Sequence, residues 1–489
     1  MEHNTVTETK KKGFLANLLF EPNPKPIMKD PNKIKKKYHW LQPAIFVCLY
    51  LLYFSSYLGR KQLAIGFNGA PGSGTHAGIE DIFHLGTEVY STLGMIYYFC
   101  YAVGKLLGGI LADKLNIRVG LPLSVAISSI FPLGIVLACN LFAGGSVSQA
   151  GMVAIMYASW GLSGFIQAAS FPMCSKALTF WYSNKNRARI WSFWSTSHEL
   201  GSAASLGLAT YLITFLNWQA VFYIPALISV SVAIVAIILL RDKPVTVGLP
   251  DVETYAGTAV KIEKAEEKEE EIDNRTQFQV FKQEILRSKT IWILSLAFIS
   301  VYIMRVGPTD WLPKMLENDS LGAIKAIIVP ACGCLGTLSI PWVSEKLFKG
   351  RRAPAIFIYF LVSTLCFIGL RLICSIETGV APIIALPENV SNVVQLILFG
   401  LLGIATYGPL VMIGGVAAIE SASKRVAAAA TGFTGAMGYL GAILMSFLGR
   451  YKVQLGNSFI YSIWIISGIV AMVLILLLWN QKANKEYTH

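Results

Sequence analysis

Residues 219–240 read QAVFYIPALISVSVAIVAIILL, a stretch without a charged side chain. A helix of about 20 residues crosses a hydrocarbon core of about 30 Å, so this stretch is long enough to span a bilayer. The whole chain has the same character: 54% of its 489 residues are hydrophobic, 14% are charged and the mean hydropathy is +0.56. This composition excludes a soluble globular protein with a polar shell and predicts an all-α polytopic membrane protein.

Similar stretches recur along the chain and predict twelve transmembrane helices, six on each side of a polar segment. The predicted spans are 40–59, 87–112, 118–143, 151–181, 190–215, 219–240, 289–307, 323–348, 353–375, 391–416, 426–449 and 457–479. The predicted organisation is an N-terminal tail (1–38), a six-helix bundle (39–241), a linker (242–288), a second six-helix bundle (289–480) and a C-terminal tail (481–489). Lysine and glutamate crowd residues 261–271 of the linker, which is typical of a solvated helix or a flexible segment.

Lysine and arginine concentrate before the first span and in alternate short connections. Because positively charged loops stay on the cytoplasmic side, we expect both termini in the cytoplasm and a multi-pass protein of the cell (inner) membrane. The net charge of +13 is explained by these loops, so we expect no nucleic-acid partner.

The sequence Tyr-x-x-Arg occurs once in each half, at Tyr57–Arg60 and Tyr302–Arg305. An arginine at membrane depth costs roughly 2.5–3.5 kcal/mol or more, which marks it as a functional candidate. Two guanidinium forks fit phosphate oxygens, and the i, i+3 spacing places each tyrosine on the face of its arginine. The alternatives are an Arg60 that reaches the membrane surface from the end of its span, and tyrosines that lie at the lipid interface.

Three further polar side chains, Lys105, His198 and Glu199, fall within predicted spans. Together with the arginines, Lys105 and His198 describe a pocket for an anion. Alternatively, Lys105 pairs with Asp310 or Glu199, and His198 is a hydrogen-bonded histidine between helices. All eight cysteines lie in predicted spans without zinc-ligand spacing, and the spans carry no nucleophile–base set, so we expect no metal, no cofactor and no enzymatic activity.

The connection after the second span reads GILADKLNIR (109–118). It matches the loop signature of the major facilitator superfamily, in which an acid between two bases, here Asp113 before Arg118, clamps neighbouring helix ends. A degraded second copy occupies residues 341–352. Resemblance to this superfamily implies two repeated six-helix bundles that expose a central site alternately to the two sides.

Longer motifs resemble the organophosphate:phosphate antiporter family of that superfamily over nearly the whole chain. They are YLGRK (57–61), GKLLGGILADK (104–114), SFWSTSHELG (192–201), RDKPVTVGLPDVETY (241–255), YIMRVGPTDWLPKML (302–316) and the stretch 407–441. The resemblance implies that Arg60 and Arg305 bind the phosphate, that His198 adds a switchable hydrogen bond and that Lys105 adds positive potential. It also implies a path lined by Tyr53, Tyr57, Tyr302 and Tyr439, and ion pairs that Lys61 and Asp310 exchange during transport.

Two positions depart from the glycerol-phosphate branch of the family, which the chain resembles most. Glu199 stands in place of an asparagine and Pro330 in place of a glutamate, so the family's salt-bridge arrangement does not transfer directly. The uncharged segment 430–435 favours glycerol 3-phosphate as the substrate. Residues 144–167 and 305–311 also resemble the hexose-phosphate branch, so exchange of hexose 6-phosphate is the alternative, followed by a sugar-phosphate sensor. We expect a monomer in the lipid bilayer that uses inorganic phosphate as the counter-substrate.

Overall fold

The structure is a computed structural model that describes residues 20, 22–71, 77–257, 279, 282–374, 382–417, 421 and 427–480. The helices of the first half are α2 (Pro31–Asn68), α3 (Ile79–Ile82), α4 (Thr87–Lys114), α5 (Ile117–Ile130), α6 (Leu133–Ala143), α7 (Gln149–Gln167), α8 (Ser170–Trp181), α9 (Asn184–Phe215) and α10 (Ala220–Leu239). The connection contains η1 (Pro244–Val247), α11 (Val252–Ala256) and η2 (Lys282–Leu286). The second half contains α14 (Lys289–Met315), α15 (Gly322–Lys346), α16 (Arg352–Ile373), α17 (Glu388–Val411), η3 (Met412–Ala417), α19 (Ala427–Gly449) and α20 (Lys452–Leu476).

Each of the twelve predicted spans coincides with one long helix or with two consecutive helices, which confirms the all-α prediction. Within the described part of the chain, ten segments are long and apolar enough to cross a membrane. The second and fifth predicted spans correspond to α4 and α9, which are not among these ten segments but contain 28 and 32 residues. The charged run 261–271 and the tail 481–489 lie outside the described residues, as do residues 1–19 of the N-terminal tail.

The third and fourth predicted spans are each confirmed as one span, Ile117–Ala143 and Gln149–Trp181, but each consists of two consecutive helices. The third breaks between α5 and α6 at Pro132, which has no N–H group to continue the helical hydrogen bonds. The fourth breaks between α7 and α8, where Pro172 occupies the first turn of the new helix.

The expected ends of the first and seventh spans were wrong, because α2 continues to Asn68 and α14 continues to Met315. Arg60 and Lys61 follow the first of these predicted ends, and Asp310 follows the second. Those side chains lie inside the protein, however, and a helix satisfies its own backbone hydrogen bonds wherever it is buried. Arg60 and Arg305 therefore lie at least about two turns inside their helices.

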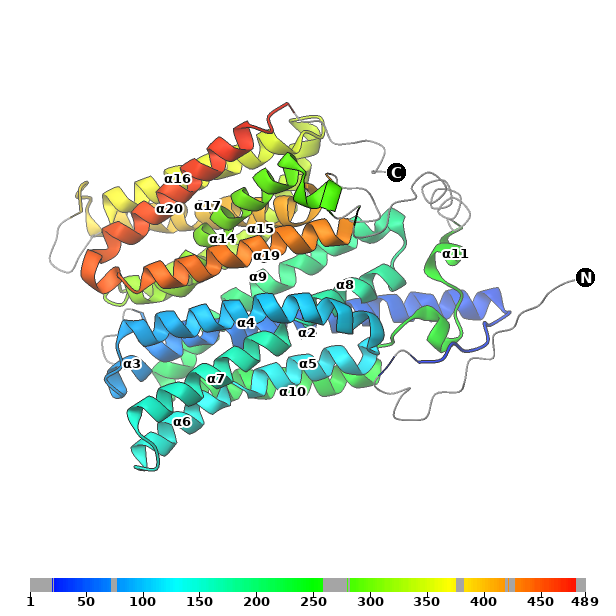
Figure 1. Ribbon diagram of the computed structural model, residues 1–489, viewed down its shortest axis with the longest axis horizontal. Coiled ribbons are helices and arrows are strands. Elements are labelled where there is room, and N and C mark those ends of the chain that lie inside the picture. Colours follow the sequence, from blue (N-terminus) through cyan, green and yellow to red (C-terminus); the bar gives the residue numbers. More distant parts are fainter. Residues whose placement is uncertain are drawn as a thin grey trace, which may run out of the picture.

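The helices form two bundles that follow the two halves of the chain (Figure 1). In the first bundle α2 packs on α9 and α4 packs on α7, and in the second the corresponding helices pair in the same way, α14 on α19 and α15 on α17. Equivalent helices also join the bundles, because α9 lies along α15 and α4 lies along α19. This arrangement is that of a two-fold repeat of six helices.

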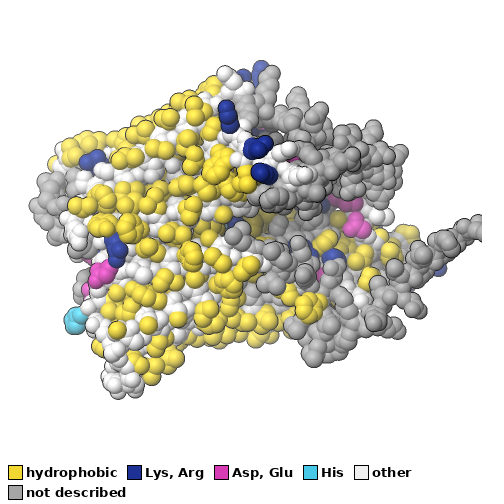
Figure 2. Space-filling model, in the orientation of Figure 1, with side chains coloured by type: hydrophobic (Ala, Val, Ile, Leu, Met, Phe, Trp, Pro, Cys, Tyr) yellow, Lys and Arg dark blue, Asp and Glu magenta, His cyan; other side chains and the backbone are white. Residues whose placement is uncertain are grey.

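The outer face of both bundles is apolar. Figure 2 shows hydrophobic side chains spread across the face, with most of the visible charged groups towards its ends. On α10 the exposed side chains include Leu227, Ile234 and Ile238, and on α20 they include Val473 and Leu476. A patch of this extent is a liability in water but suits contact with lipid.

The start of the polar connection is packed against the first bundle. Tyr38 donates to the carbonyl of Pro250 at 2.6 Å and Lys37 donates to the carbonyl of Val247 at 2.6 Å. Asp242 accepts from the backbone of Ile117 at 2.8 Å. Residues 242–257 therefore pack against the first turns of α2 and the start of α5.

Candidate anion-binding site between the bundles

Arg60 of α2 lies within a cage of four tyrosines. Its Nη1 donates to Tyr57 Oη at 3.0 Å, and its guanidinium carbon lies 4.7–5.6 Å from the ring centroids of Tyr57, Tyr97, Tyr98 and Tyr101. Tyr57 shares the helix face of Arg60, and the other three rings come from α4. The arginine is 5% exposed. Rings around a desolvated cation stabilise it by up to about 2 kcal/mol each, which makes a buried arginine tolerable here.

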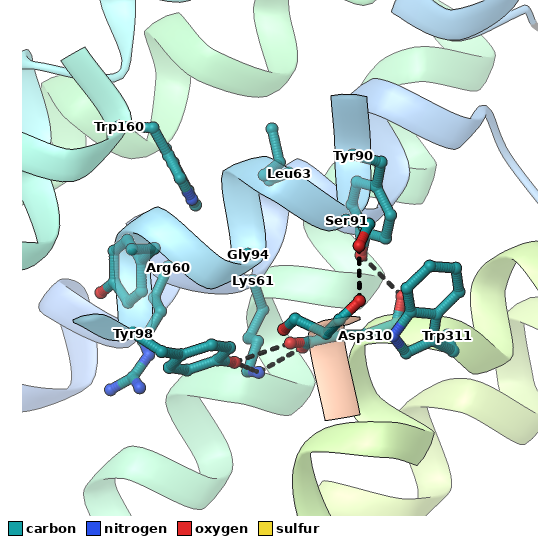
Figure 3. A pocket seen from close by; sticks show the side chains of 13 residues that line it. Arg60, Lys61, Leu63, Tyr90, Ser91, Gly94, Tyr98, Trp160, Asp310 and Trp311 are labelled. Carbon is teal, nitrogen blue, oxygen red and sulfur yellow. Dashed lines mark hydrogen bonds and ion pairs between the residues drawn. The ribbon is translucent and has the colours of Figure 1, made fainter. Parts of the chain in front are cut away.

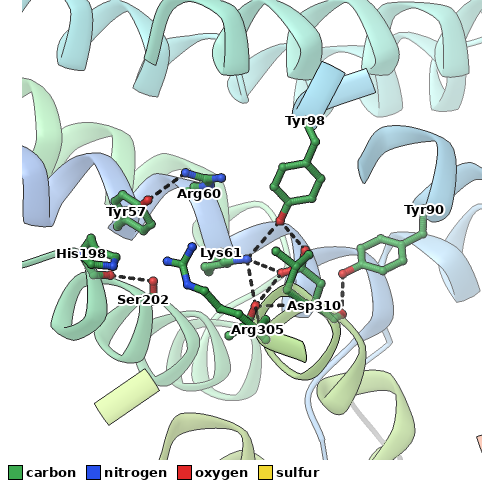
Figure 4. Close-up of polar contacts among 11 residues, drawn as sticks. Tyr57, Arg60, Lys61, Tyr90, Tyr98, His198, Ser202, Arg305 and Asp310 are labelled. Carbon is green, nitrogen blue, oxygen red and sulfur yellow. Dashed lines mark hydrogen bonds and ion pairs between the residues drawn. The ribbon is translucent and has the colours of Figure 1, made fainter. Parts of the chain in front are cut away.

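Arg305 approaches from α14 of the other bundle. It is 6% exposed and lies 5.0 Å from the ring of Tyr407 and 5.9 Å from that of Tyr302. Figure 4 shows its guanidinium directed into the space beside Tyr57 and His198, on the same side as Arg60. The two guanidinium groups are close enough to repel one another.

Both arginines have an unsatisfied donor. The Nε atoms of Arg60 and Arg305 are buried and have no hydrogen-bond partner among the described residues. A buried donor that stays unpaired costs about 1–3 kcal/mol, more for a charged group. An anion with several oxygens can satisfy both donors and offset the repulsion, so the pair is chemically suited to phosphate.

His198 of α9 completes this group, and the predicted Tyr53 joins it. The imidazole centroid lies 5.3 Å from the ring of Tyr57 and 6.3 Å from the rings of Tyr53 and Tyr407. Its Nδ1 faces the carbonyl oxygen of Ser195, which can only accept, so Nδ1 carries a proton. The other nitrogen, Nε2, is left for contact with substrate or with a neighbouring side chain.

Lys105 and Tyr439 extend the site along α4 and α19. The Nζ of Lys105 lies 5.5 Å from the ring centroid of Tyr439 and 4.8 Å from that of Phe171. A Cβ on Gly435 would lie 3.2 Å from this Nζ, so the glycine makes room for the ammonium group. Tyr439 also contacts Tyr302, at 5.0 Å between centroids. The structure thus brings together all eight side chains predicted to bind substrate.

Glu199 takes a partner from the other bundle. Its Oε1 accepts a hydrogen bond from the hydroxyl of Thr337 on α15 and lies 3.9 Å from His198 Nε2. Lys105 is directed to aromatic rings, and Asp310 pairs with Lys61, so the alternative that Lys105 pairs with either acid does not describe this structure.

Lys61 and Asp310 form an ion pair between the bundles. Lys61 Nζ also donates to Thr309 Oγ1 at 3.1 Å, and Tyr98 donates to the second oxygen of Asp310 at 2.6 Å. Tyr90 donates to the Asp310 carbonyl at 2.6 Å. Lys61, Tyr90, Tyr98 and Asp310 line a small cavity, together with residues that include Arg60, Trp160, Trp311 and Ser446 (Figure 3). The helices are thereby tied together on the side of the arginines that is remote from the chain termini.

A second ion pair crosses between the bundles one turn further along α14. Lys314 Nζ lies 2.5 Å from both carboxylate oxygens of Glu80 and donates to Thr87 Oγ1 at 2.8 Å. Lys314 is 7% exposed, so the pair is largely shielded from water. The two pairs close this end of the molecule in two successive layers.

The loop signature lies at the opposite end. Arg118 is exposed, and its Nε donates to the carbonyl of Ile237 in the last turn of α10 at 2.9 Å. The side chain of Asp113 lies outside the described residues, so its clamping role stays a prediction. Among the described residues, no group of three His, Cys, Asp or Glu side chains is arranged to hold a metal ion.

Several site residues were missed by sequence reasoning. They are Tyr97, Tyr98, Tyr101, Thr309, Tyr407, Thr337, Glu80 and Lys314. The sequence YYFCY (97–101) in the middle of a predicted span was a readable signal, because three tyrosines at helical spacing share one side with a membrane-depth cation. Glu80 lies between the first two predicted spans, and nothing in the local sequence pairs it with Lys314.

Comparison with known proteins agrees with this architecture. A family model described as Major Facilitator Superfamily matches residues 49–386. The "Probable hexose phosphate transport protein" of Chlamydia pneumoniae is 29% identical over 94% of this chain and 96% of its own length. The "Membrane sensor protein UhpC" of Salmonella typhimurium is 28% identical over 97% and 100%, and the "Glycerol-3-phosphate transporter" of Bacillus subtilis is 27% identical over 96% and 99%.

Among solved structures, a bacterial homologue of the lysosomal transporter Spinster, in an inward-facing and unoccupied conformation, has a TM-score of 0.56. It is 16% identical and the match covers 92% of this chain and 96% of that one, so it bears on the fold alone. The sequence relatives are consistent with the organophosphate:phosphate antiporter family that the motifs indicated. The chain belongs to the Major Facilitator Superfamily.

Proposed function

We propose that this protein moves an organic phosphate ester across a membrane in exchange for inorganic phosphate. The observation that supports this best is the arrangement of Arg60 and Arg305, one from each bundle, buried side by side with unpaired Nε atoms. Relatives named for glycerol 3-phosphate and hexose phosphate transport, similar over nearly the whole chain, support the same class of substrate.

The arginine pair provides a physical reason for obligatory exchange. A phosphate dianion cannot cross a low-dielectric region unless its charge is neutralised, and two guanidinium groups do this at depth. Binding to both arginines also draws α2 and α14 together. An unoccupied site leaves two like charges facing one another, which disfavours reorientation until another anion binds.

The ion pairs provide the gate. Lys61–Asp310 and Lys314–Glu80 hold the bundles together at the end remote from the termini. Reorientation by rocking of the bundles requires both pairs to separate. An anion that bridges Arg60 and Arg305 screens the positive field next to Lys61 and so couples occupancy of the site to this separation.

Glycerol 3-phosphate is the proposed substrate. Segment 430–435 of α19 is uncharged, Thr434 is buried with its hydroxyl 3.2 Å from Ser295 Oγ, and Gly435 accommodates Lys105. Hexose 6-phosphate is the second candidate, because relatives named for hexose phosphate are as similar as those named for glycerol 3-phosphate.

Proteoliposomes that contain only this protein and are loaded with inorganic phosphate test the proposal. We expect them to take up labelled glycerol 3-phosphate, with unlabelled glucose 6-phosphate as the weaker competitor. Stronger competition by glucose 6-phosphate would transfer the assignment to hexose phosphate. No uptake of either ester, by protein that still binds one of them, would favour a sensor, which the similarity to a membrane sensor protein makes the second function.

The proposed setting is the inner membrane, with a monomer as the functional unit and both termini in the cytoplasm. Support for the orientation comes from basic residues at one end, where Arg118, Arg241 and Lys243 surround the ends of α5 and α10. Protection of a terminal tag from added protease in sealed, right-side-out membrane vesicles tests this orientation.

A further inference from the structure

Glu199 is a buried acid for which the phosphate site has no direct use. It is 0% exposed and lies on α9 where this helix packs against α15 of the other bundle. One carboxylate oxygen accepts from Thr337, and the other, Oε2, is buried without a hydrogen-bond partner among the described residues. Burial of an ionised carboxylate away from water costs several kcal/mol unless the group is paired.

The groups that face Glu199 come from five helices. They are His198 on α9, Arg305 on α14, Cys334 on α15, Tyr50 on α2 and Tyr407 on α17. Arg305 provides the fixed positive charge in this group, and it is also one of the two arginines of the phosphate site. His198 Nε2, at 3.9 Å from Oε1, is a second link to that site.

This shared arginine connects the two sites electrostatically. While Arg305 is unoccupied, its charge helps to keep Glu199 ionised. A phosphate dianion on Arg305 compensates that charge and adds negative charge nearby, so the carboxyl group gains affinity for a proton. By linkage, a proton on Glu199 must equally strengthen binding of the dianion.

We propose that Glu199 is a proton-binding site coupled to the phosphate site, and that it takes up a proton when a phosphate dianion binds between Arg60 and Arg305. The proton comes from solvent and resides on the carboxyl group, where Thr337 remains its hydrogen-bond partner. This inference rests on the proposed function. It implies that the ester crosses together with a proton and that affinity for the dianion rises as the pH falls.

Proton uptake on binding tests the proposal. The purified full-length protein is titrated with glycerol 3-phosphate, and in parallel with glucose 6-phosphate, in weak buffer that contains a pH indicator. Work at about pH 8 keeps the ester fully dianionic, because the second pKa of a phosphate monoester is about 6. We expect the wild-type protein to take up a substantial fraction of one proton per ester bound. Calorimetry on the same samples measures binding itself.

Three variants locate the proton. Glu199→Gln retains an acceptor for Thr337 but cannot titrate, and we expect it to bind ester with no proton uptake and no pH dependence of affinity between about pH 6.5 and pH 8.5 beyond that of the ester itself. Cys334→Ser removes the adjacent thiol and should leave the uptake at the wild-type value. Thr337→Val removes the hydrogen bond and should shift the pH at which uptake is half-maximal.

The outcomes separate this inference from the function on which it rests. Absence of ester binding in the wild-type protein would count against the phosphate site. Ester binding without proton uptake, or uptake that persists in Glu199→Gln, would overturn the proton site alone. Loss of uptake in His198→Gln together with its persistence in Glu199→Gln would assign the proton to the imidazole instead.

Discussion

Lys61 on α2 and Asp310 on α14 form an ion pair across the interface of the two bundles, and each follows one of the two site arginines within its own helix. Lys61 is adjacent to Arg60, and Asp310 lies five residues after Arg305. Any movement that separates this pair therefore moves both arginines. This ion pair and the two arginines are carried by the same two helices.

Removal of one member of this pair should impair exchange strongly. Asp310→Asn leaves Lys61 buried without its counter-ion, and breaking a buried pair in this way costs about 3–5 kcal/mol. We expect Asp310→Asn and Lys61→Met each to lower the exchange rate in proteoliposomes by more than about tenfold. The exchanged pair, Lys61→Asp with Asp310→Lys, should recover part of the rate, and a double variant no better than the worse single variant would argue against direct coupling.

The second ion pair should matter about as much as the first. The side chains of Lys314 and Glu80 are 9% and 16% exposed, close to the 6% and 16% of Lys61 and Asp310, so Glu80→Gln also leaves a buried ammonium group without its counter-ion. We expect Glu80→Gln to reduce exchange by about tenfold or more. Asp81→Asn is the matched control because Asp81 is exposed and adjacent. Equal loss in both variants would show a general effect of charge at this end rather than a gate contact.

The arginine pair should not tolerate lysine. A charge-assisted hydrogen bond contributes about 1.5–3 kcal/mol, so loss of the bidentate fork in Arg60→Lys or Arg305→Lys should weaken ester binding by at least about tenfold to a hundredfold. Binding of labelled ester and phosphate exchange measure this. Arg371→Lys is the control, because Arg371 lies on a different helix, α16, and donates to Ser458 Oγ at 3.2 Å. Near-normal exchange in either site variant would remove the phosphate assignment.

His198→Ala should weaken binding without abolishing exchange. The imidazole contributes one hydrogen bond, worth about 0.5–1.5 kcal/mol net, so the apparent affinity should fall by about twofold to tenfold. The exposed His39, at the start of α2, provides the control His39→Ala. Unchanged affinity in His198→Ala would make this residue a packing element between helices.

Because α15 packs closely on α17, Gly403 of α17 should not tolerate even the methyl side chain of alanine. A Cβ at this position would lie 2.1 Å from the carbonyl oxygen of Val329, so backbone must shift. We expect Gly403→Ala to destabilise the protein by about 1–3 kcal/mol, seen as a lower melting temperature in detergent. On α19, a Cβ at Gly432 meets no described atom within 4 Å, so Gly432→Ala should melt close to the wild type.

The sequence alone determined the membrane class, the twelve spans and the repeat. Each of these depends on the length and polarity of a local segment, and the cost of placing such a segment in lipid is nearly a sum over its residues. The same cost singled out Arg60, Arg305 and His198, because ionisable groups at membrane depth are rare without a function. Arg60 is the exception, because a charged residue ends a span only where the helix faces lipid, and Arg60 is surrounded by protein within α2.

Only the tertiary structure decided which side chains meet. Lys61 pairs with Asp310, Lys314 with Glu80 and Glu199 with Thr337, and the members of each pair are more than a hundred residues apart. These contacts depend on how α2, α3 and α9 of one bundle lie against α14 and α15 of the other. Helix packing is a property of complementary surfaces, which neither helix contains by itself. The two Tyr-x-x-Arg sequences indicated an anion site, and the packing of the bundles placed its gate and a buried acid beside it.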